Sequence, residues 1–174
     1  YAGFWVRFAA FLVDTVIVTV AGLIIGASAG FLFFSALAEN LAISFLIQGS
    51  GLIVSWLFYA WFESSEARAT PGKMVFRLKV VGADDHERIS FLRATGRYWA
   101  KLISAMLLGV GYLMQPFTAR KQALHDLMSG AVVVSTGPAS RLLLWLCLFL
   151  AFVPLFFVIF LLFGVAMPFA RILF

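Results

Sequence analysis

Residues 5–34 read WVRFAAFLVDTVIVTVAGLIIGASAGFLFF, an apolar run that is interrupted only by Arg7 and Asp14 among charged residues. The run exceeds the roughly 20 residues that an α-helix needs to cross a bilayer, so it predicts a transmembrane helix. At about 1.5 Å per residue, Asp14 lies roughly 13 Å along this helix from Trp5, an aromatic residue of the kind found at the headgroup level. The sequence therefore predicts an aspartate near the middle of the membrane.

Arg7 and Asp14 lie on the same face of the predicted helix, because seven residues at about 100° per residue bring them within roughly 20° of each other. They are two turns apart, on the order of 10 Å, which argues against a direct ion pair within the helix. Ionised groups that are buried in a membrane cost several kcal/mol unless they are paired. Each must find a partner elsewhere in the fold, and Arg97 is the expected partner of Asp14.

The composition indicates an integral membrane protein. The chain has 174 residues, of which 63% are hydrophobic and 12% are charged, whereas soluble domains have roughly 45–50% apolar and 25% charged residues. The net charge of +5 comes from basic residues that lie beside apolar segments, so anionic lipid headgroups are the expected partner and nucleic acid is not. The lone cysteine, Cys147, allows no intrachain disulfide.

Four apolar segments predict an all-α, multi-pass transmembrane helical bundle; they cover residues 5–34, 41–62, 98–117 and 142–168. Glycines and Pro116 break the third segment. A re-entrant helical hairpin, giving three full spans plus the hairpin, keeps the following cations on the cytoplasmic side and is favoured; a single crossing would give four spans. We expect a membrane domain over residues 1–134 and an extra C-terminal transmembrane helix over residues 135–174.

The polar loop at residues 63–97 holds many basic residues, while the loop between the first two helices holds none. By the positive-inside rule, the long loop is cytoplasmic. Within it, residues 75–81 read VFRLKVV, which predicts a short strand or hairpin at the membrane interface, with an interfacial helix as the alternative.

Two further sets of residues suggest roles in the membrane. Small residues four apart allow close helix packing, and in the first helix they are Gly22, Gly26 and Gly30. Basic residues beside apolar segments favour contact with lipid headgroups, and they are Lys73, Arg93, Lys101, Arg120 and Lys121.

Three features together carry a family resemblance: Arg7 with Asp14 in the first helix, the TPGK sequence at residues 70–73 with Arg97, and LHDLMSG at residues 124–130, which contains Asp126. With them, residues 1–134 resemble the RDD family of small prokaryotic membrane proteins, which is named for one arginine and two aspartates. Those positions match Arg7, Asp14 and Asp126. The resemblance implies a transport role, with cation/proton antiport attributed to some members.

The expected function is therefore ion-coupled transport across a prokaryotic plasma membrane, with an ion, proton or charge-pair site at Arg7, Asp14, Arg97 and Asp126. A membrane carboxylate suits this role, because desolvation raises its pKa and a nearby cation lowers it. The alternatives are a non-catalytic membrane scaffold or regulatory subunit, and a lipid-handling protein. We expect a homo-oligomer or a subunit of a membrane complex, and no catalytic residues, cofactor or metal.

Overall fold

The computed structural model describes residues 1–32, 41–107 and 109–153. The chain divides into two units, residues 1–139 and residues 140–174. The first unit contains every element from α1 to β2. The second contains a helix at Arg141–Val153, and residues 154–168 of the predicted C-terminal segment lie outside the described residues.

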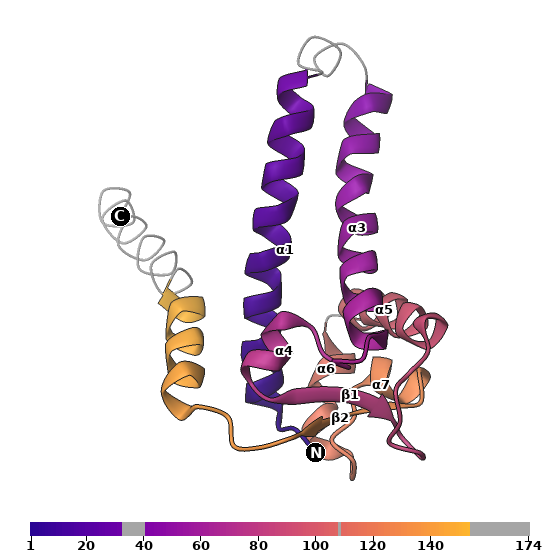
Figure 1. Ribbon diagram of the computed structural model, residues 1–174, viewed down its shortest axis with the longest axis vertical. Coiled ribbons are helices and arrows are strands. Elements are labelled where there is room, and N and C mark those ends of the chain that lie inside the picture. Colours follow the sequence, from indigo (N-terminus) through magenta and orange to yellow (C-terminus); the bar gives the residue numbers. More distant parts are fainter. Residues whose placement is uncertain (33–40, 108, 154–174) are drawn as a thin grey trace, which may run out of the picture. The chain divides into compact units, whose positions relative to one another are not determined.

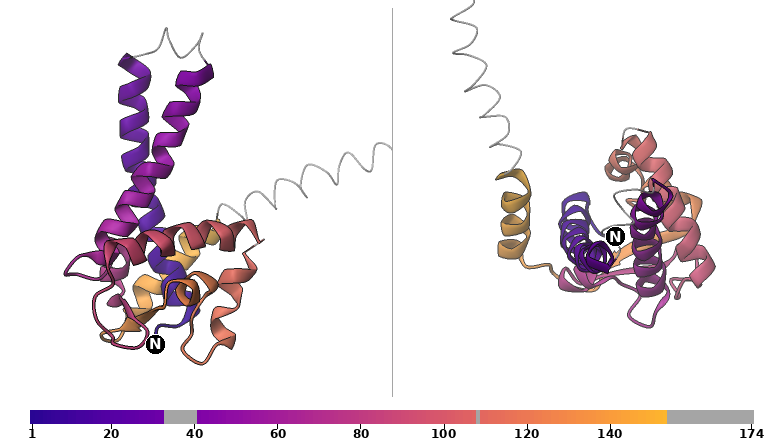
Figure 2. Two further views of the ribbon diagram at one scale, coloured as in Figure 1. Left: turned by 90° about the vertical axis from the view of Figure 1, so that its right-hand side faces the viewer. Right: turned by 90° about the horizontal axis from the view of Figure 1, so that it is seen from above.

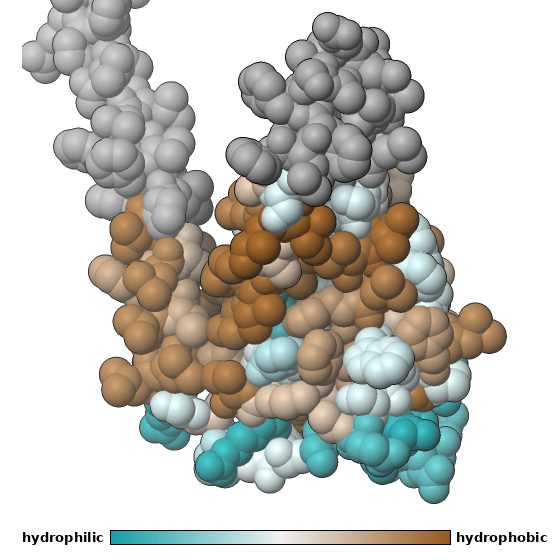
Figure 3. Space-filling view, turned by 45° about the horizontal axis from the view of Figure 1, so that its top comes forward, coloured by the Kyte–Doolittle hydropathy of each residue, from teal (hydrophilic) through white to brown (hydrophobic). Residues whose placement is uncertain are grey.

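Helices α1 (Phe4–Leu32) and α3 (Leu41–Ser64) run side by side away from the rest of the first unit (Figure 1). Large apolar side chains on the outer part of α1 are exposed, among them Val20, Leu23 and Ile24. The residues Phe4–Ser28 are long and apolar enough to cross a membrane. Hydrophobic residues cover this part of the molecule, and hydrophilic ones gather at the opposite end (Figure 3).

The fold is mostly helical, as predicted, but it is not purely α, because a two-stranded antiparallel sheet joins distant parts of the chain. Strand β1 (Leu78–Gly82) pairs with β2 (Ala131–Ser135), with Leu78 opposite Ser135 and Gly82 opposite Ala131. The predicted strand exists, but it does not form a local hairpin. After β1 the chain turns through a loop in which Glu87 N donates to Asp85 Oδ1, and it continues into a helix. The β-branched residues of β2 supply the partner strand.

Two helices that begin within residues 63–97 lie around the base of α1 and α3. Helix α4 (Pro71–Val75) packs on α1, and α5 (Phe91–Met106) crosses beside α3 (Figures 1 and 2). Ser90 caps α5 by accepting a hydrogen bond from Arg93 N. The charged residue Arg97 on α5 is buried, while Leu92 and Met106 are exposed. Helix α5 therefore turns its charged face toward the protein and an apolar face outward.

The third apolar segment, predicted over residues 98–117, is not one straight helix. Its first helix, α5, already begins at Phe91. After α5 the chain forms α6 (Val110–Leu113), η1 (Gln115–Phe117) and α7 (Leu124–Met128). The axis bends by 110° between Phe91–Met106 and Val110–Phe117, and Gly109 has the left-handed φ of 77° that favours glycine. Whether the segment re-enters or crosses the membrane stays a prediction.

Candidate functional site

The two charged residues of α1 point to different partners. Arg7 Nη1 lies 2.5 Å from Asp126 Oδ2 in an ion pair, and its other terminal nitrogen donates to the carbonyl of Lys121 at 2.8 Å. Asp14 is 1% exposed, and its partners come from α4 and the residue before it. The shared helix face thus serves two separate contacts with the loops that fold back onto α1.

Asp14 fastens the start of α4 to α1. Its Oδ2 accepts a hydrogen bond from Thr70 Oγ1 at 2.6 Å, and its Oδ1 accepts one from Gly72 N at 2.7 Å. Pro71 occupies the first helical position, where no N–H is needed. A carboxylate at a helix start satisfies free backbone N–H groups. In the TPGK sequence, Thr70 and Gly72 supply the donors to Asp14, and Pro71 stands where no N–H is needed.

The prediction that Arg97 pairs with Asp14 is wrong. Arg97 binds Asp126 and Glu63 instead, and among the described residues the hydrogen-bond donors to Asp14 are the neutral groups of Thr70 and Gly72. Helix periodicity identified the face of α1 that carries the carboxylate. It gave no information about which returning segment reaches that face.

Replacing Gly72 by Ala is expected to lower the free energy of unfolding by about 1–3 kcal/mol, because an added methyl forces α4 away from α1. A Cβ at this position would overlap the carbonyl oxygen of Ala10 and lie 2.8 Å from Asp14 Oδ1. Thermal unfolding in detergent, followed by tryptophan fluorescence, measures the change. Gly96→Ala in α5 is the matched control: its Cβ meets nothing within 4 Å, so this change should stabilise the helix by roughly 0.5–1 kcal/mol. Equal effects at both positions would contradict the proposed contact.

Six buried or half-buried side chains form a continuous network of ion pairs, which we call the charge cluster: Arg7, Glu63, Lys73, Arg97, Lys101 and Asp126. They come from α1, α3, α4, α5 and α7. Arg97 lies between the two carboxylates, donating to Asp126 Oδ1 from Nη2 at 2.5 Å and to Glu63 Oε2 from Nη1 at 2.6 Å. The charge cluster therefore connects α1 to α3 through α5 and α7.

Glu63 is the member that sequence reasoning missed, because it was assigned to the polar loop at residues 63–97. It is fully buried at the end of α3. Its Oε1 accepts hydrogen bonds from Lys73 Nζ at 2.7 Å and from Lys101 Nζ at 3.0 Å, and the Lys101 ammonium also lies 4.1 Å from the centroid of the Tyr59 ring. The available signal was a carboxylate four residues after Tyr59 at the end of an apolar helix, in a chain with surplus cations.

Asp126 is held ionised and His125 neutral. Burial alone would raise the pKa of Asp126, but the positive charges of Arg97 and Arg7 outweigh it and hold that pKa well below its usual range. Burial lowers the pKa of His125 to about 3, against the opposing attraction of Asp126. The His125 ring packs 5.1 Å from the ring of Tyr112, and its Nδ1 is buried without a hydrogen-bond partner among the described residues. At neutral pH, His125 adds no charge to the charge cluster.

The basic residues expected at lipid headgroups divide into two sets. Lys73 and Lys101 point inward to Glu63, so they do not form the expected headgroup surface. Arg93 donates to the carbonyls of Ser129 and Gly130. Arg93, Arg120 and Lys121 are all exposed; Arg120 donates to the carbonyl of Ala83, and Lys121 carries the carbonyl that Arg7 binds.

The small residues of α1 have open surroundings. A Cβ at Gly22 or Gly26 meets nothing within 4 Å, so the close helix approach expected there does not occur within the described part of the chain. The surroundings of Gly30 lie outside the described residues. Among the residues described, no cluster of His, Cys, Asp and Glu has a composition that could hold a metal ion.

Comparison with known proteins gives a consistent assignment. Residues 1–130 match the model of the RDD family. The chain is 32% identical over 147 residues to the uncharacterized protein YxaI of Bacillus subtilis (strain 168), an alignment that covers 76% of this chain and 96% of the relative. It is 30% identical over 139 residues to the uncharacterized membrane protein YteJ of the same organism, covering 77% and 80%. No solved structure matches significantly. The chain therefore belongs to the RDD family and is a membrane protein.

Proposed function

We propose that this protein exchanges a monovalent cation for a proton across a prokaryotic plasma membrane, with Glu63 as the cation-binding carboxylate and Lys101 as the proton donor. One observation carries the proposal: a single buried oxygen, Glu63 Oε1, accepts hydrogen bonds from two lysine ammonium groups at 2.7 and 3.0 Å. Ionisable groups buried in membrane proteins commonly mark ion and proton pathways.

The charge balance of the cluster supports exchange. Four cations face two carboxylates, and the carboxylate of Asp14 binds neutral donors elsewhere. Burial disfavours a charge without a partner. Arginine does not release its proton in proteins, whereas a buried lysine does so readily. The surplus charge is therefore removed most easily at a lysine.

The exchange step conserves charge. A cation that reaches Glu63 Oε1 takes the place of one ammonium, and the Lys101 ammonium loses its proton to the solvent on the side from which the cation came and becomes a neutral amine. When the cation leaves on the other side, the amine takes up a proton from that side. Lys101 is the better donor of the two lysines, because its ammonium lies 3.0 Å from Glu63 Oε1, against 2.7 Å for Lys73, and the longer ion pair stabilises the charged form less.

The proposed membrane placement follows the apolar surface. We propose that α1 and α3 both cross the membrane, that α5 lies along its cytoplasmic face with exposed Leu92, Trp99 and Met106 in the lipid, and that several copies or another subunit assemble to complete a pathway. No enzymatic step and no cofactor is part of this proposal.

Lys101→Arg is the sharpest test, because arginine keeps the positive charge but not the ability to lose a proton. Purified protein in proteoliposomes with an internal pH dye should show proton movement when Na⁺ or K⁺ is added outside. The initial rate should fall at least about ten-fold in Lys101→Arg, as general acid–base groups contribute on the order of 10²–10⁴ in rate. Lys121→Arg, the same change at an exposed lysine, should transport at the unmodified rate.

Two results would contradict the proposal. Wild-type protein without cation-dependent proton movement would exclude exchange, and Lys101→Arg with normal unfolding temperature and normal flux would exclude Lys101 as the proton donor. A non-catalytic scaffold or regulatory subunit is the second candidate. It is favoured by the fact that both oxygens of Glu63 and of Asp126 already accept hydrogen bonds, as in a static core.

A further inference from the structure

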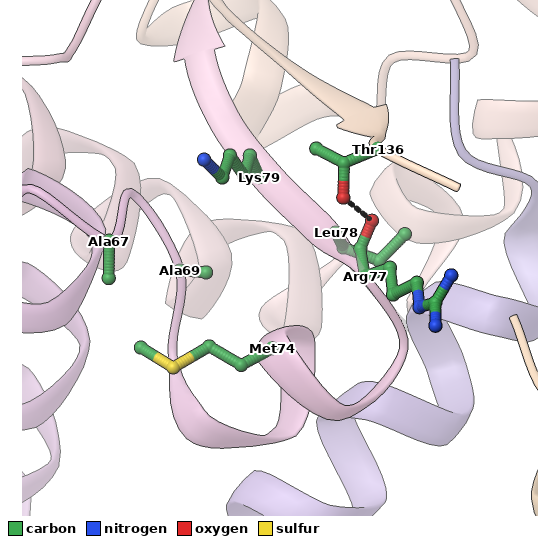
Figure 4. A pocket seen from close by; sticks show the side chains of 7 residues that line it. All are labelled: Ala67, Ala69, Met74, Arg77, Leu78, Lys79 and Thr136. Atoms are coloured by element: carbon green, nitrogen blue, oxygen red, sulfur yellow. Dashed lines mark hydrogen bonds between the residues drawn. The ribbon is translucent and has the colours of Figure 1, made fainter. Parts of the chain in front are cut away.

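We propose that a pocket between α4 and β1 binds the phosphate headgroup of an anionic phospholipid from the cytoplasmic leaflet. The cavity has a volume of about 260 Å³ and an open mouth, and its lining is drawn in Figure 4: Ala67, Ala69, Met74, Arg77, Leu78, Lys79 and Thr136. It lies apart from the charge cluster and contains none of its members.

Two cations at this pocket have no acidic partner. Arg77 and Lys79 are exposed, and among the described residues neither forms an ion pair. By contrast, the exposed cations Arg88 and Arg120 pair with Glu66 and Asp84. The charged ends of Arg77 and Lys79 lie on different sides of the pocket and point away from each other (Figure 4), so each cation would meet headgroup oxygens at its own edge of the mouth.

Contacts with α1 give the level of the pocket along the membrane normal. Gly72 N, at the start of α4, donates to Asp14, whereas Ala2 N, before the start of α1, donates to Val133 of β2. Residues 77–79 lead from the end of α4 into β1, and β1 pairs with β2. They therefore lie between these two levels. The exposed Trp5 lies between the same two levels on α1, and tryptophan marks the headgroup region. The pocket is therefore level with lipid phosphates.

The last turn of α4 has an apolar surface that suits this level. Met74 is 43% exposed and Val75 is 48% exposed, immediately before the two cations in the sequence. Apolar side chains next to unpaired basic ones are the combination that anchors protein surfaces at anionic membranes. A soluble anion would need only the cations, so the apolar turn favours a lipid.

The backbone holds Arg77 in an uncommon conformation. Its φ is 55°, in the left-handed region that favours glycine. Its carbonyl accepts hydrogen bonds from Thr136 N at 2.8 Å and Thr136 Oγ1 at 3.0 Å. These bonds hold the backbone of Arg77 at the pocket in a conformation that glycine would adopt without strain.

The experiment uses the full chain in neutral detergent micelles, titrated by calorimetry with dioctanoyl phosphatidylglycerol, dioctanoyl phosphatidylcholine and inorganic phosphate. We expect phosphatidylglycerol to bind and phosphatidylcholine to bind at least ten-fold more weakly. In the double variant Arg77→Gln/Lys79→Gln, binding of phosphatidylglycerol should weaken by about thirty-fold, from the usual contribution of two basic side chains near an anionic membrane.

Arg88→Gln/Arg141→Gln is the matched control, since it removes two exposed cations that do not line the pocket and should bind phosphatidylglycerol normally. Equal loss in this control, equal binding of both lipids, or inorganic phosphate binding as tightly as phosphatidylglycerol would overturn the proposal. If the double variant fails to fold, Lys79→Gln alone decides the matter, with a loss of about five-fold expected and unchanged binding contradicting the site.

Discussion

Replacing Asp126 by Asn is expected to lower the free energy of unfolding by about 3–5 kcal/mol, because it leaves the buried Arg97 and the half-buried Arg7 without their shared carboxylate. Asp126 accepts hydrogen bonds from Arg7 Nη1 through Oδ2 and from Arg97 Nε and Nη2 through Oδ1. An amide has one acceptor oxygen, and its NH₂ group would face these donors. For a chain of this size the unfolding temperature should fall by roughly 10 °C, measured by tryptophan fluorescence in detergent.

Asp84→Asn is the matched control for this prediction. The side chain of Asp84 is 96% exposed, at 3.5 Å from Arg120, and an exposed pair contributes little to stability. Adding Arg7→Gln to Asp126→Asn should restore part of the lost stability, because it removes one unpaired cation. An unfolding temperature that Asp126→Asn leaves unchanged would show that the charge cluster does not hold these elements together.

Replacing Glu63 by Gln is the second change with a large expected effect, since three cations lose their shared partner. Lys73 and Lys101 bind Oε1, and Arg97 binds Oε2. The expected loss is again about 3–5 kcal/mol, a large part of the stability of a domain. Refolding yield and unfolding temperature in detergent measure it.

Glu66→Gln makes the same chemical change three residues away. Glu66 is 89% exposed on its side chain and pairs with Arg88, so the unfolding temperature should stay within about 1 °C of the wild type. Adding Lys101→Gln to Glu63→Gln should recover part of the loss. If the two glutamates behave alike, the burial of Glu63 is not what makes it important.

The partners of the buried charges were the least predictable part of the site. The sequence indicated that Arg7 and Asp14 share a helix face and need separate partners, and the structure places them with Asp126 and Thr70. Arg7 and Asp126 are 119 positions apart in the chain. Pairing across such a distance depends on how the intervening loops fold back, which local periodicity does not encode.

Burial of the loop residues was missed for a related reason. Residues 63–97 contain so many charges that they were assigned to a polar loop, yet Glu63 and Lys73 are buried. Composition reports the number of charged groups, whereas burial depends on whether opposite charges from several elements meet. Here they meet because α5 directs its charged face inward.

The sequence by itself determined the long apolar helix at α1, the family-defining residues and the strand tendency of β1, because each depends on neighbours within a few turns or on residue identity. Only the tertiary structure decided that β1 pairs with β2, that Asp14 binds the start of α4 and that Glu63 lies at the centre of three cations. These contacts join segments that are distant in the chain. Their formation is set by the closure of loops and the pairing of buried charges, which are properties of the whole fold.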